Sequence, residues 1–371
     1  MKEKALPQEM HFKKRPLTRN GVAMSCYFRT SVCSPYRKAL LQITERCNLH
    51  CAHCFVSAGN YGDTMHLETI GSVVIPRLKQ CRVISITLTG GEPFAHPDII
   101  EIVRLLRNAD LQISICTNAT LISLEQMKAL SEIGGVLLNV SLDGFRPESH
   151  GKFRGNKASF FTTIRTIQAL GQYKLLKGLL VTPNTFANIE EYVEICNFAV
   201  ENGAAYVLTN PLSRFGRGIK SKDKIGTTGG IMQEIRKATS RFGSQVELVN
   251  IRFPNDRQPL ASCEAGNIIY IFTAGEVTVC PYLVFAAKTP DSMHKPEEFI
   301  VGNILLDTDI AERLDDYKFH ERYQVGDNQT CKTCSLESRC GKGCPAAVIS
   351  SGQRIGAVDQ EVCPIIGSQK E

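Results

Sequence analysis

Strand-like and helix-like runs alternate six times between residues 39 and 242, and this alternation constrains the fold more than any other feature of the chain. The strand-like runs are short and rich in branched apolar residues, whereas the runs between them have apolar residues at helical spacing. Because parallel strands need a crossover connection, this order predicts a parallel sheet covered by helices. The expected strands are 39–44, 83–88, 111–117, 136–142, 175–182 and 205–210, and the expected helices are about 66–80, 97–108, 123–132, 158–172, 188–201 and 229–242.

The predicted fold class is therefore α/β, with a partial (β/α)6 TIM-like barrel as its main unit. Ser123 and Gln126 predict a capped start for one of the helices. After Arg252 the pattern changes to a β-hairpin centred on Ala274 and Gly275, a helix-like stretch at about 308–320 and a segment rich in cysteine and glycine, which predict a small cysteine-rich α+β domain. The expected units are an N-terminal arm or short hairpin over 1–36, the barrel over 37–255 and the cysteine-rich domain over 256–371.

The fifteen cysteines raise the question of the redox compartment. The N-terminal stretch has no apolar run that resembles a signal peptide. Nor does any run reach the roughly 18 apolar residues that a membrane-spanning helix needs. In a reducing compartment, closely spaced cysteines bind metals more often than they form disulfides. We therefore expect a cytoplasmic metal-binding protein without a membrane partner.

The formal net charge of +6 is modest for a chain of 371 residues. Basic residues gather in two places: the N-terminal run with Lys13, Lys14, Arg15 and Arg19, and the loop from Arg214 to Lys224. Neither run is interleaved with aromatic residues, as single-stranded nucleic-acid binding surfaces are. We expect solvated surface in both places and no nucleic-acid partner.

Three cysteines follow the first predicted strand with the spacing C-x3-C-x2-C, namely Cys47, Cys51 and Cys54. Ligands gather at the carboxyl ends of parallel strands, so these thiols should lie at the mouth of the barrel. Three thiolates are one fewer than a closed four-cysteine site needs. Either a remote ligand completes the site or one metal position is open. A zinc knuckle is the alternative, with His50 or His53 as its fourth ligand.

A second ordered set of seven cysteines lies in the C-terminal third of the chain. Its spacing is typical of metal ligands, either in a zinc ribbon or around iron–sulfur clusters. The set comprises Cys263, Cys280, Cys331, Cys334, Cys340, Cys344 and Cys363. Of the remaining five cysteines, Cys116 and Cys196 are predicted to be small buried apolar residues. Cys26 and Cys33 lie in the arm, where a ligand or hydrogen-donor role stays open, and Cys81 precedes the second strand.

The three-cysteine motif is followed, after the second predicted strand, by the motif Gly-Gly-Glu-Pro. Together these motifs resemble the radical S-adenosylmethionine (radical SAM) superfamily, and the resemblance extends over the whole barrel region. It implies that Cys47, Cys51 and Cys54 hold three irons of a [4Fe-4S] cluster. The fourth iron would bind the amino and carboxylate groups of SAM. An electron from the cluster would then cleave SAM to a 5′-deoxyadenosyl radical.

The resemblance also assigns residues to SAM at the ends of the second and third strands. The glycines of the motif would let the backbone approach a ligand closely, and Glu92 would accept hydrogen bonds from the methionyl amine. Thr117 and Asn118 would suit the ribose. The residues of the motif are Gly90, Gly91, Glu92 and Pro93.

Ser141, Asp143 and Arg154 follow the fourth predicted strand. A member of the superfamily would use Ser141 and Arg154 near the carboxylate of SAM, where arginine provides a charge-assisted fork. Asp143 either belongs to this group or forms the turn that an Asp-Gly pair favours. The sequence identifies no catalytic acid, base or hydrogen donor.

The C-terminal cysteines resemble the SPASM extension of the same superfamily, and all seven positions of that pattern are filled. The resemblance implies two auxiliary [4Fe-4S] clusters, and so three clusters in all. Cys331, Cys334, Cys340 and Cys363 would ligate one auxiliary cluster completely. The other cluster would have only Cys263, Cys280 and Cys344. We expect one open iron there, with closure by Cys26 or Cys33 as the alternative.

The SPASM group that this chain resembles contains enzymes that modify peptides and proteins. It also includes enzymes of small-molecule pathways. Sulfatase maturases have an aspartate directly after the second SPASM cysteine and a further cysteine before it. Here Pro281 follows Cys280, and no cysteine lies between Cys263 and Cys280, which disfavours that activity. A third hypothesis is a non-catalytic electron-transfer protein. The Gly-Gly-Glu-Pro motif disfavours it, because such a protein would need no SAM site.

The expected function is therefore hydrogen abstraction from a peptide, in the maturation of a ribosomal peptide or of a peptide-derived cofactor. The alternative is a radical epimerase or dehydrogenase of a small-molecule natural product such as an aminoglycoside. One expected partner is an electron donor such as flavodoxin or ferredoxin. Because 46 residues before Cys47 are few for a leader-binding domain, either a separate peptide-carrier protein recognises the leader or the enzyme binds the peptide unaided. The sequence does not fix the oligomeric state.

Overall fold

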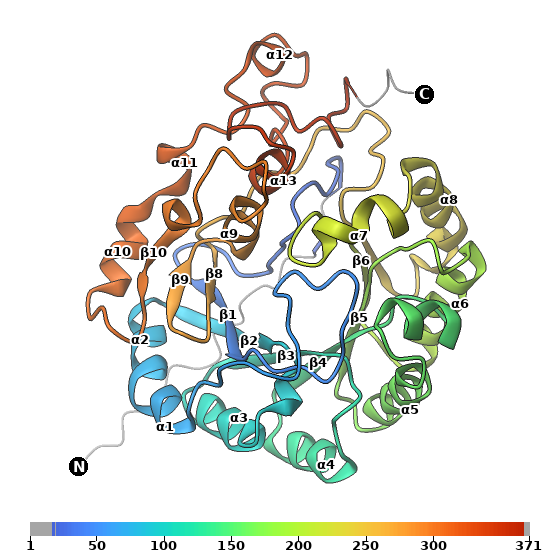
Figure 1. Cartoon of the computed structure of the whole chain (residues 1–371), viewed down its shortest axis with the longest axis vertical. Coiled ribbons are helices and arrows are strands. Elements are labelled where there is room, and N and C mark those ends of the chain that lie inside the picture. Colours follow the sequence, from blue (N-terminus) through green and yellow to red (C-terminus); the bar gives the residue numbers. More distant parts are fainter. Residues whose placement is uncertain (1–16, 19, 367–371) are drawn as a thin grey trace.

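The computed structural model of the chain describes residues 17–18 and 20–366 (Figure 1). The N-terminal basic run at Lys13, Lys14, Arg15 and Arg19 lies outside the described residues, as does most of the first half of the predicted arm. Within the described part, no helix has both the length and the apolar character that crossing a membrane requires.

One ten-stranded sheet organises the molecule, with the strand order β10-β9-β8-β1-β2-β3-β4-β5-β6-β7. Strands β1 to β7 pair in parallel with their neighbours in chain order, so the predicted parallel sheet is confirmed. All six predicted strands are present. They are β1 (Arg37–Thr44), β2 (Val83–Gly90), β3 (Gln112–Thr117), β4 (Val136–Ser141), β5 (Leu176–Val181) and β6 (Tyr206–Thr209).

A seventh parallel strand, β7 (Glu247–Asn250), extends the sheet beyond β6 and was not predicted. Its four residues include a glutamate and an asparagine, so the strand lacks the apolar run on which the other strands were recognised. Figure 1 shows the sheet curved, with the helices between its strands on the outside. The partial TIM-like barrel is therefore confirmed, with one more strand than expected.

The helices that connect the strands confirm the predicted alternation. Ser123 begins one of them as predicted: its hydroxyl accepts a hydrogen bond from the N–H of Gln126 at 3.2 Å, and the Gln126 side chain accepts one from the N–H of Ser123 at 3.0 Å. The helices of the barrel are α1 (Leu67–Thr69), the π-helical turn η1 (Ile70–Val74), α2 (Ile75–Gln80), α3 (Ile99–Asn108), α4 (Leu124–Ile133), α5 (Ser159–Gln172), α6 (Ile189–Glu201), α7 (Gly218–Ile225) and α8 (Gly229–Thr239), with the short turns η2 (Pro93–Ala95), η3 (Pro147–Gly151) and η4 (Ser240–Phe242).

The C-terminal region continues the same sheet. The predicted hairpin is formed by β8 (Ile268–Ile271) and β9 (Glu276–Thr278), and β8 pairs in parallel with β1. The sheet therefore crosses the boundary that the sequence places at residue 255. The other elements are β10 (Ile300–Asn303), α9 (Pro281–Ala287), η5 (Pro296–Phe299), α10 (Ile310–Tyr317), α11 (Phe319–Arg322), α12 (Gln329–Lys332) and α13 (Pro345–Ser350).

Side chains alternate between the two faces of the barrel strands. In β2, Ile86 and Leu88 are fully buried in the apolar core, whereas Thr87 between them lines an internal cavity. In β3, Ile115 is likewise buried and Cys116 lines the cavity. The outer face of the sheet thus forms the core with the helices, while smaller and polar side chains on the inner face leave space in the barrel.

Candidate functional site

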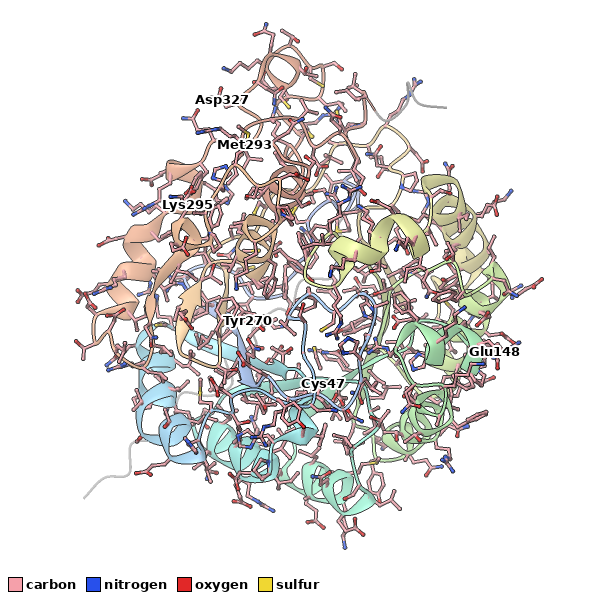
Figure 2. The ribbon with its side chains drawn as sticks, in the orientation of Figure 1. Cys47, Glu148, Tyr270, Met293, Lys295 and Asp327 are labelled. Carbon is pink, nitrogen blue, oxygen red and sulfur yellow. The ribbon has the colours of Figure 1, made fainter. Side chains whose placement is uncertain are left out.

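The loop that follows β1, residues 45–59, holds three thiols at the carboxyl edge of the sheet, and is called the cysteine loop below. Figure 2 places Cys47 near the middle of the molecule. The sulfur of Cys47 faces the N–H of Leu49 at 3.4 Å and the side-chain amide of Asn118 at 3.9 Å. The sulfur of Cys51 lies 3.9 Å from a guanidinium nitrogen of Arg154. These donors favour the thiolate form, which is the form that binds metals.

Burial of these two thiols opposes their ionisation to thiolates. It raises the pKa of the Cys51 thiol to about 12, with Arg154 acting in the opposite direction. It also raises the pKa of Cys47. A metal bound here would have to displace these protons, and the nearby N–H donors would then stabilise the resulting charge. The donor set therefore fits a cluster ligated by three thiolates, as the spacing of Cys47, Cys51 and Cys54 predicts.

The two histidines that could complete a zinc knuckle lie in different environments. His50 is exposed, whereas the ring of His53 stacks on the ring of Phe153 with centroids 4.4 Å apart. Burial lowers the pKa of His53 to about 4, so this ring is neutral at physiological pH. Among the described residues, no three Cys, His, Asp or Glu side chains converge closely enough to hold a single metal ion. A [4Fe-4S] cluster, in contrast, spreads its thiolates around four irons.

The two glycines after β2 seat the cysteine loop on the sheet. The N–H of Gly91 donates to the carbonyl of Thr44 at 2.8 Å, and the N–H of Glu92 donates to the carbonyl of Arg46 at 2.8 Å. A Cβ atom on Gly91 would lie 2.2 Å from the Arg46 oxygen, and one on Gly90 would lie 2.2 Å from the Thr44 oxygen. The close approach that these glycines permit is thus to the start of the cysteine loop. Their predicted contact with SAM stays a prediction.

Glu92 is almost fully buried and joins the ends of two strands. Its carboxylate accepts hydrogen bonds from the hydroxyl of Thr117 at 2.6 Å, from the N–H of Asn118 at 2.7 Å and from the N–H of Phe94 at 3.2 Å. Burial raises its pKa, and these three donors oppose that shift. Pro93 is buried beside it in η2. Glu92 therefore positions the two residues that the sequence assigns to the ribose, and its contact with the methionyl amine stays a prediction.

Asp143 and Arg154 form a buried ion pair after β4. The Nε of Arg154 lies 2.7 Å from one carboxylate oxygen of Asp143, and the other oxygen accepts from the N–H of Thr182 at 2.8 Å. Although burial alone would raise the pKa of Asp143, the Arg154 guanidinium holds it below its usual value. Asp143 thus orients Arg154 toward Cys51, rather than acting only as a turn former. Ser141 is half-buried at the end of β4.

A helix that the sequence did not predict holds the cysteine loop from the other side. The guanidinium of Arg217 donates to the carbonyl of Cys51 at 2.7 Å and to the carbonyl of Ala58 at 2.8 Å. The hydroxyl of Ser221 donates to the carbonyl of Ala52 at 2.6 Å. Two side chains of one segment therefore fix three backbone carbonyls of the cysteine loop.

The prediction of a solvated loop from Arg214 to Lys224 is therefore wrong in part. Most of this run forms α7, and Arg217 faces the cysteine loop. The run lacks an apolar stripe, so helical periodicity could not reveal it. A weaker sequence signal was Gly216, which has a φ of 52° and at which a Cβ atom would lie 2.4 Å from the carbonyl oxygen of Cys54.

A cavity of about 630 Å³ occupies the interior of the barrel, and is called the barrel cavity below. This volume is typical of a small-molecule or cofactor site. The predicted SAM residues Ser141, Asp143 and Arg154 line it, together with His53 and Phe55 of the cysteine loop. Part of the cysteine loop and three of the nine candidate SAM residues thus border one space. The candidate residues that are not among those lining the cavity are Gly90, Gly91, Glu92, Pro93, Thr117 and Asn118, and the three thiols Cys47, Cys51 and Cys54.

Cys116 also lines the barrel cavity, so its predicted role as a buried apolar residue is wrong. It is half-buried and its sulfur faces the side-chain amide of Asn139 at 3.8 Å. Cys116 lies on the inner face of β3, and the sequence of the strand does not show which of its faces points into the barrel. Cys196 in α6 is buried as predicted, and Cys81 is buried at the end of α2.

The seven C-terminal cysteines gather around two further cavities. The outer cysteine cavity is lined by Cys331, Cys334, Cys340 and Cys363. The inner cysteine cavity is lined by Cys263, Cys280 and Cys344, and also by Cys26 of the arm. The sulfurs of Cys334 and Cys340 each face a backbone N–H, from Leu336 at 3.4 Å and from Leu260 at 3.3 Å. The structure thus groups these thiols as the two expected ligand sets, and their role as ligands stays a prediction.

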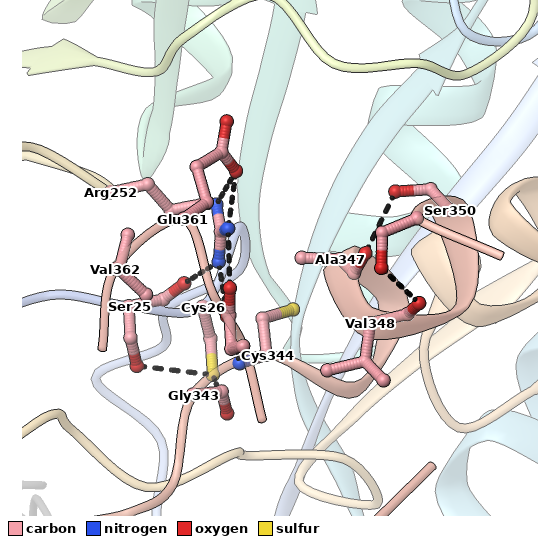
Figure 3. Close-up of polar contacts among 12 residues, drawn as sticks. Ser25, Cys26, Arg252, Gly343, Cys344, Ala347, Val348, Ser350, Glu361 and Val362 are labelled. Carbon is pink, nitrogen blue, oxygen red and sulfur yellow. Dashed lines mark hydrogen bonds and ion pairs between the residues drawn. The ribbon is translucent and has the colours of Figure 1, made fainter. Parts of the chain in front are cut away.

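A buried ion-pair network joins the barrel, the arm and the C-terminal segment (Figure 3). Two nitrogens of Arg252 contact the two oxygens of Asp359 at 2.7 and 2.9 Å. Arg252 also pairs with Glu361 and donates to the carbonyl of Ser25 at 3.1 Å. Asp359 in turn accepts from the N–H of Cys344 at 2.9 Å. The network therefore fixes the backbone beside the inner cysteine cavity.

Comparison with known proteins agrees with this geometry. Residues 41–199 match the model of the Radical SAM superfamily. The chain is 28% identical to the antilisterial bacteriocin subtilosin biosynthesis protein AlbA of Bacillus subtilis over 73% of this chain and 58% of AlbA. It is 25% identical to the mycofactocin maturase MftC of Mycolicibacterium smegmatis over 86% of this chain and 81% of MftC.

The fold has solved counterparts as well. The structure of Streptococcus suis SuiB bound to precursor peptide SuiA superposes with a TM-score of 0.69 at 16% sequence identity. That likeness covers 89% of this chain and 77% of SuiB, so it extends well beyond the barrel into the C-terminal region. Residues 41–199 therefore form a radical SAM domain, and the cysteines after it have the spacing of the SPASM extension.

Proposed function

We propose that this protein cleaves SAM reductively and uses the resulting 5′-deoxyadenosyl radical to take hydrogen from a peptide, in the maturation of a ribosomal peptide or a peptide-derived cofactor. One observation supports this most: residues of the cysteine loop line the same cavity as Asp143 and Arg154. When bound, the cluster and SAM would supply the electron and the carbon-centred radical.

The chain's own residues would bind and orient these groups. Cys47, Cys51 and Cys54 would hold the cluster. Arg154, oriented by Asp143, would present the remaining donors of its guanidinium to the carboxylate of SAM. Between the cysteine loop and the arm, rings such as those of Phe55, Tyr27 and Tyr282 pack together: the centroid of Tyr282 lies 5.7 Å from that of Phe55 and 5.0 Å from that of Tyr27. These rings would keep water away from the radical.

The names of the relatives favour a peptide over a small-molecule substrate. AlbA is named for subtilosin biosynthesis and MftC for mycofactocin maturation, and SuiB was solved with a precursor peptide. The barrel cavity is large enough to take one or two side chains of a peptide beside SAM. We also propose two partners, an electron donor such as flavodoxin or ferredoxin and a separate peptide carrier. The proposed location is the cytoplasm, because thiolate-ligated clusters require a reducing compartment.

The direct test starts from the reading frames next to the gene, where we expect a short precursor peptide. Incubated anaerobically with SAM, a reductant and the reconstituted enzyme, this peptide is expected to lose two hydrogens or another fixed mass, which mass spectrometry would localise to one residue. The matched control is the same reaction without SAM. An unchanged peptide, together with conversion of an aminoglycoside from a neighbouring pathway, would replace the peptide proposal with the small-molecule alternative.

The proposed cofactor content makes a separate prediction. Three [4Fe-4S] clusters require about twelve irons and as many sulfides per chain. Iron and sulfide analysis of the anaerobically reconstituted protein checks this. About four irons per chain with stoichiometric zinc would leave a cluster only at the cysteine loop and make the C-terminal cysteines a zinc module.

Arg217 is expected to support activity without touching SAM. Alanine in its place removes two charge-assisted hydrogen bonds to carbonyls of the cysteine loop, each worth about 1.5–3 kcal/mol. The rate of 5′-deoxyadenosine formation should fall about tenfold or more. Arg214→Ala is the matched control, because Arg214 pairs with the exposed Asp223 instead. Equal rates in the two variants would show that the loop does not depend on Arg217.

A further inference from the structure

A fourth thiol faces the inner cysteine cavity. Cys26, from the N-terminal arm, lines this cavity together with Cys263, Cys280 and Cys344, and only 4% of its surface is exposed. Its sulfur lies 3.7 Å from the carbonyl of Gly343, the residue before Cys344 (Figure 3). The inner cavity thus has as many thiols around it as the outer one.

We propose that Cys26 is the fourth cysteine ligand of the auxiliary cluster held by Cys263, Cys280 and Cys344. This inference rests on the proposed cluster content. It replaces the expected open iron with a fully ligated cluster, so that no substrate atom binds iron there. It also gives the N-terminal arm a function, since the arm supplies one ligand to a site whose other ligands lie more than 200 residues later.

The backbone just before Cys26 is held in place by contacts with residues 259–261. Before it, the N–H of Ala23 donates to the carbonyl of Pro259 and the carbonyl of Ala23 accepts from the N–H of Ala261, both at 2.8 Å. Next to it, the hydroxyl of Ser25 donates to the carbonyl of Ala261 at 2.8 Å. A ligand that is positioned before the metal binds loses little conformational freedom on binding. This is the arrangement expected of a ligand-bearing segment.

The ion-pair network of Arg252 also holds the backbone beside Cys26. Its guanidinium donates to the carbonyl of Ser25, and its N–H donates to the carbonyl of Met24 at 2.7 Å. Through Asp359, the same guanidinium is linked to the N–H of Cys344. One buried arginine therefore fixes the backbones of both Cys26 and Cys344, which keeps their sulfurs at one cavity.

Cys33 provides the comparison within the arm. It is exposed and does not line the inner cysteine cavity, although it is only seven residues from Cys26. Of the two arm cysteines that the sequence left open as ligands, the geometry therefore points to Cys26. Cys33→Ala is the matched control for Cys26→Ala.

The test uses the full chain with Cys47, Cys51 and Cys54 replaced by alanine, so that only auxiliary clusters remain. This parent should contain about eight irons, and cyanide should not change the EPR spectrum of its reduced form. Adding Cys33→Ala should change neither property. Adding Cys26→Ala should either make the spectrum sensitive to cyanide, because one iron is opened, or remove about four irons while the spectrum of the outer cluster persists.

Three results would overturn the proposal. The first is a cyanide-sensitive parent, which would already have an open iron. The second is a Cys26→Ala variant with eight irons and an unchanged, cyanide-insensitive spectrum. The third is a metal-free Cys26→Ala protein that is itself unfolded while the metal-free parent is folded, which would make the residue structural. A parent without auxiliary iron would instead contradict the proposed cluster content, so the two failures are distinguishable.

Discussion

Replacing Cys47, Cys51 and Cys54 together by alanine is expected to abolish the formation of 5′-deoxyadenosine from SAM. The three thiols are the cysteine side chains of the cysteine loop, and the cluster they are proposed to hold supplies the electron that cleaves SAM. The loss should reach the detection limit. Among the described residues, Cys116 on the inner face of β3 is the one cysteine that lines the barrel cavity, and a single thiol cannot replace three ligands of a cluster.

The same variant should keep its auxiliary clusters. The contacts that hold the cysteine loop involve its backbone carbonyls, with Arg217 and Ser221 as donors, so the loop does not need the thiols to keep its path. Iron should therefore fall by about four per chain, to about eight. Cys33→Ala, at an exposed position, should match the unmodified protein in both measurements. Continued production of 5′-deoxyadenosine by the triple variant would refute the assignment of the cofactor site.

Of the substitutions proposed for this protein, Arg252→Met is expected to lower the free energy of unfolding most. The Arg252 side chain is completely buried, and it neutralises Asp359, whose side chain is only 3% exposed. Methionine would leave this carboxylate buried without its cation. Breaking a buried pair in this way costs about 3–5 kcal/mol, because an uncompensated charge remains in the interior. The variant should also incorporate less iron, since the network fixes the backbone beside Cys344.

Unfolding midpoints of the anaerobically purified proteins measure this effect. The control is Arg236→Met, since Arg236 pairs with Asp256 at a position where the two side chains are 31% and 55% exposed. Exposed pairs contribute at most about 1 kcal/mol, so this variant should unfold close to the unmodified protein. If Arg252→Met unfolded at the same midpoint as Arg236→Met, the network would not stabilise the fold.

The parallel strands could be predicted because each is a buried run of branched apolar residues, and the start of α4 could be predicted because Ser123 and Gln126 form a local cap. The strand β7 and the helix α7 could not, because neither has an apolar periodicity of its own. Tertiary contacts decide these two elements: β7 pairs with β6, and α7 is held against the cysteine loop through Arg217.

The candidate site, like the fold, could be predicted from the sequence only in part. Spacing predicted the three cysteines of the cysteine loop and the seven C-terminal cysteines as metal ligands, whereas the resemblance to the SPASM extension supplied the division of those seven between two clusters. The place of Cys26 could not be predicted, because contacts of the arm with Pro259 and Ala261 bring it to the inner cysteine cavity. Nor could the continuous sheet, since the pairing of β8 with β1 joins segments more than 200 residues apart.

The measurement that tests the central claim most directly is hydrogen transfer. The unmodified protein, with all its clusters, would be incubated with SAM, a reductant and the precursor peptide that we expect in a neighbouring reading frame, made with deuterated residues. The account predicts that deuterium from the peptide appears in 5′-deoxyadenosine as the peptide is modified. Unlabelled 5′-deoxyadenosine alongside a modified peptide, or a cluster-loaded protein that leaves SAM intact, would contradict it.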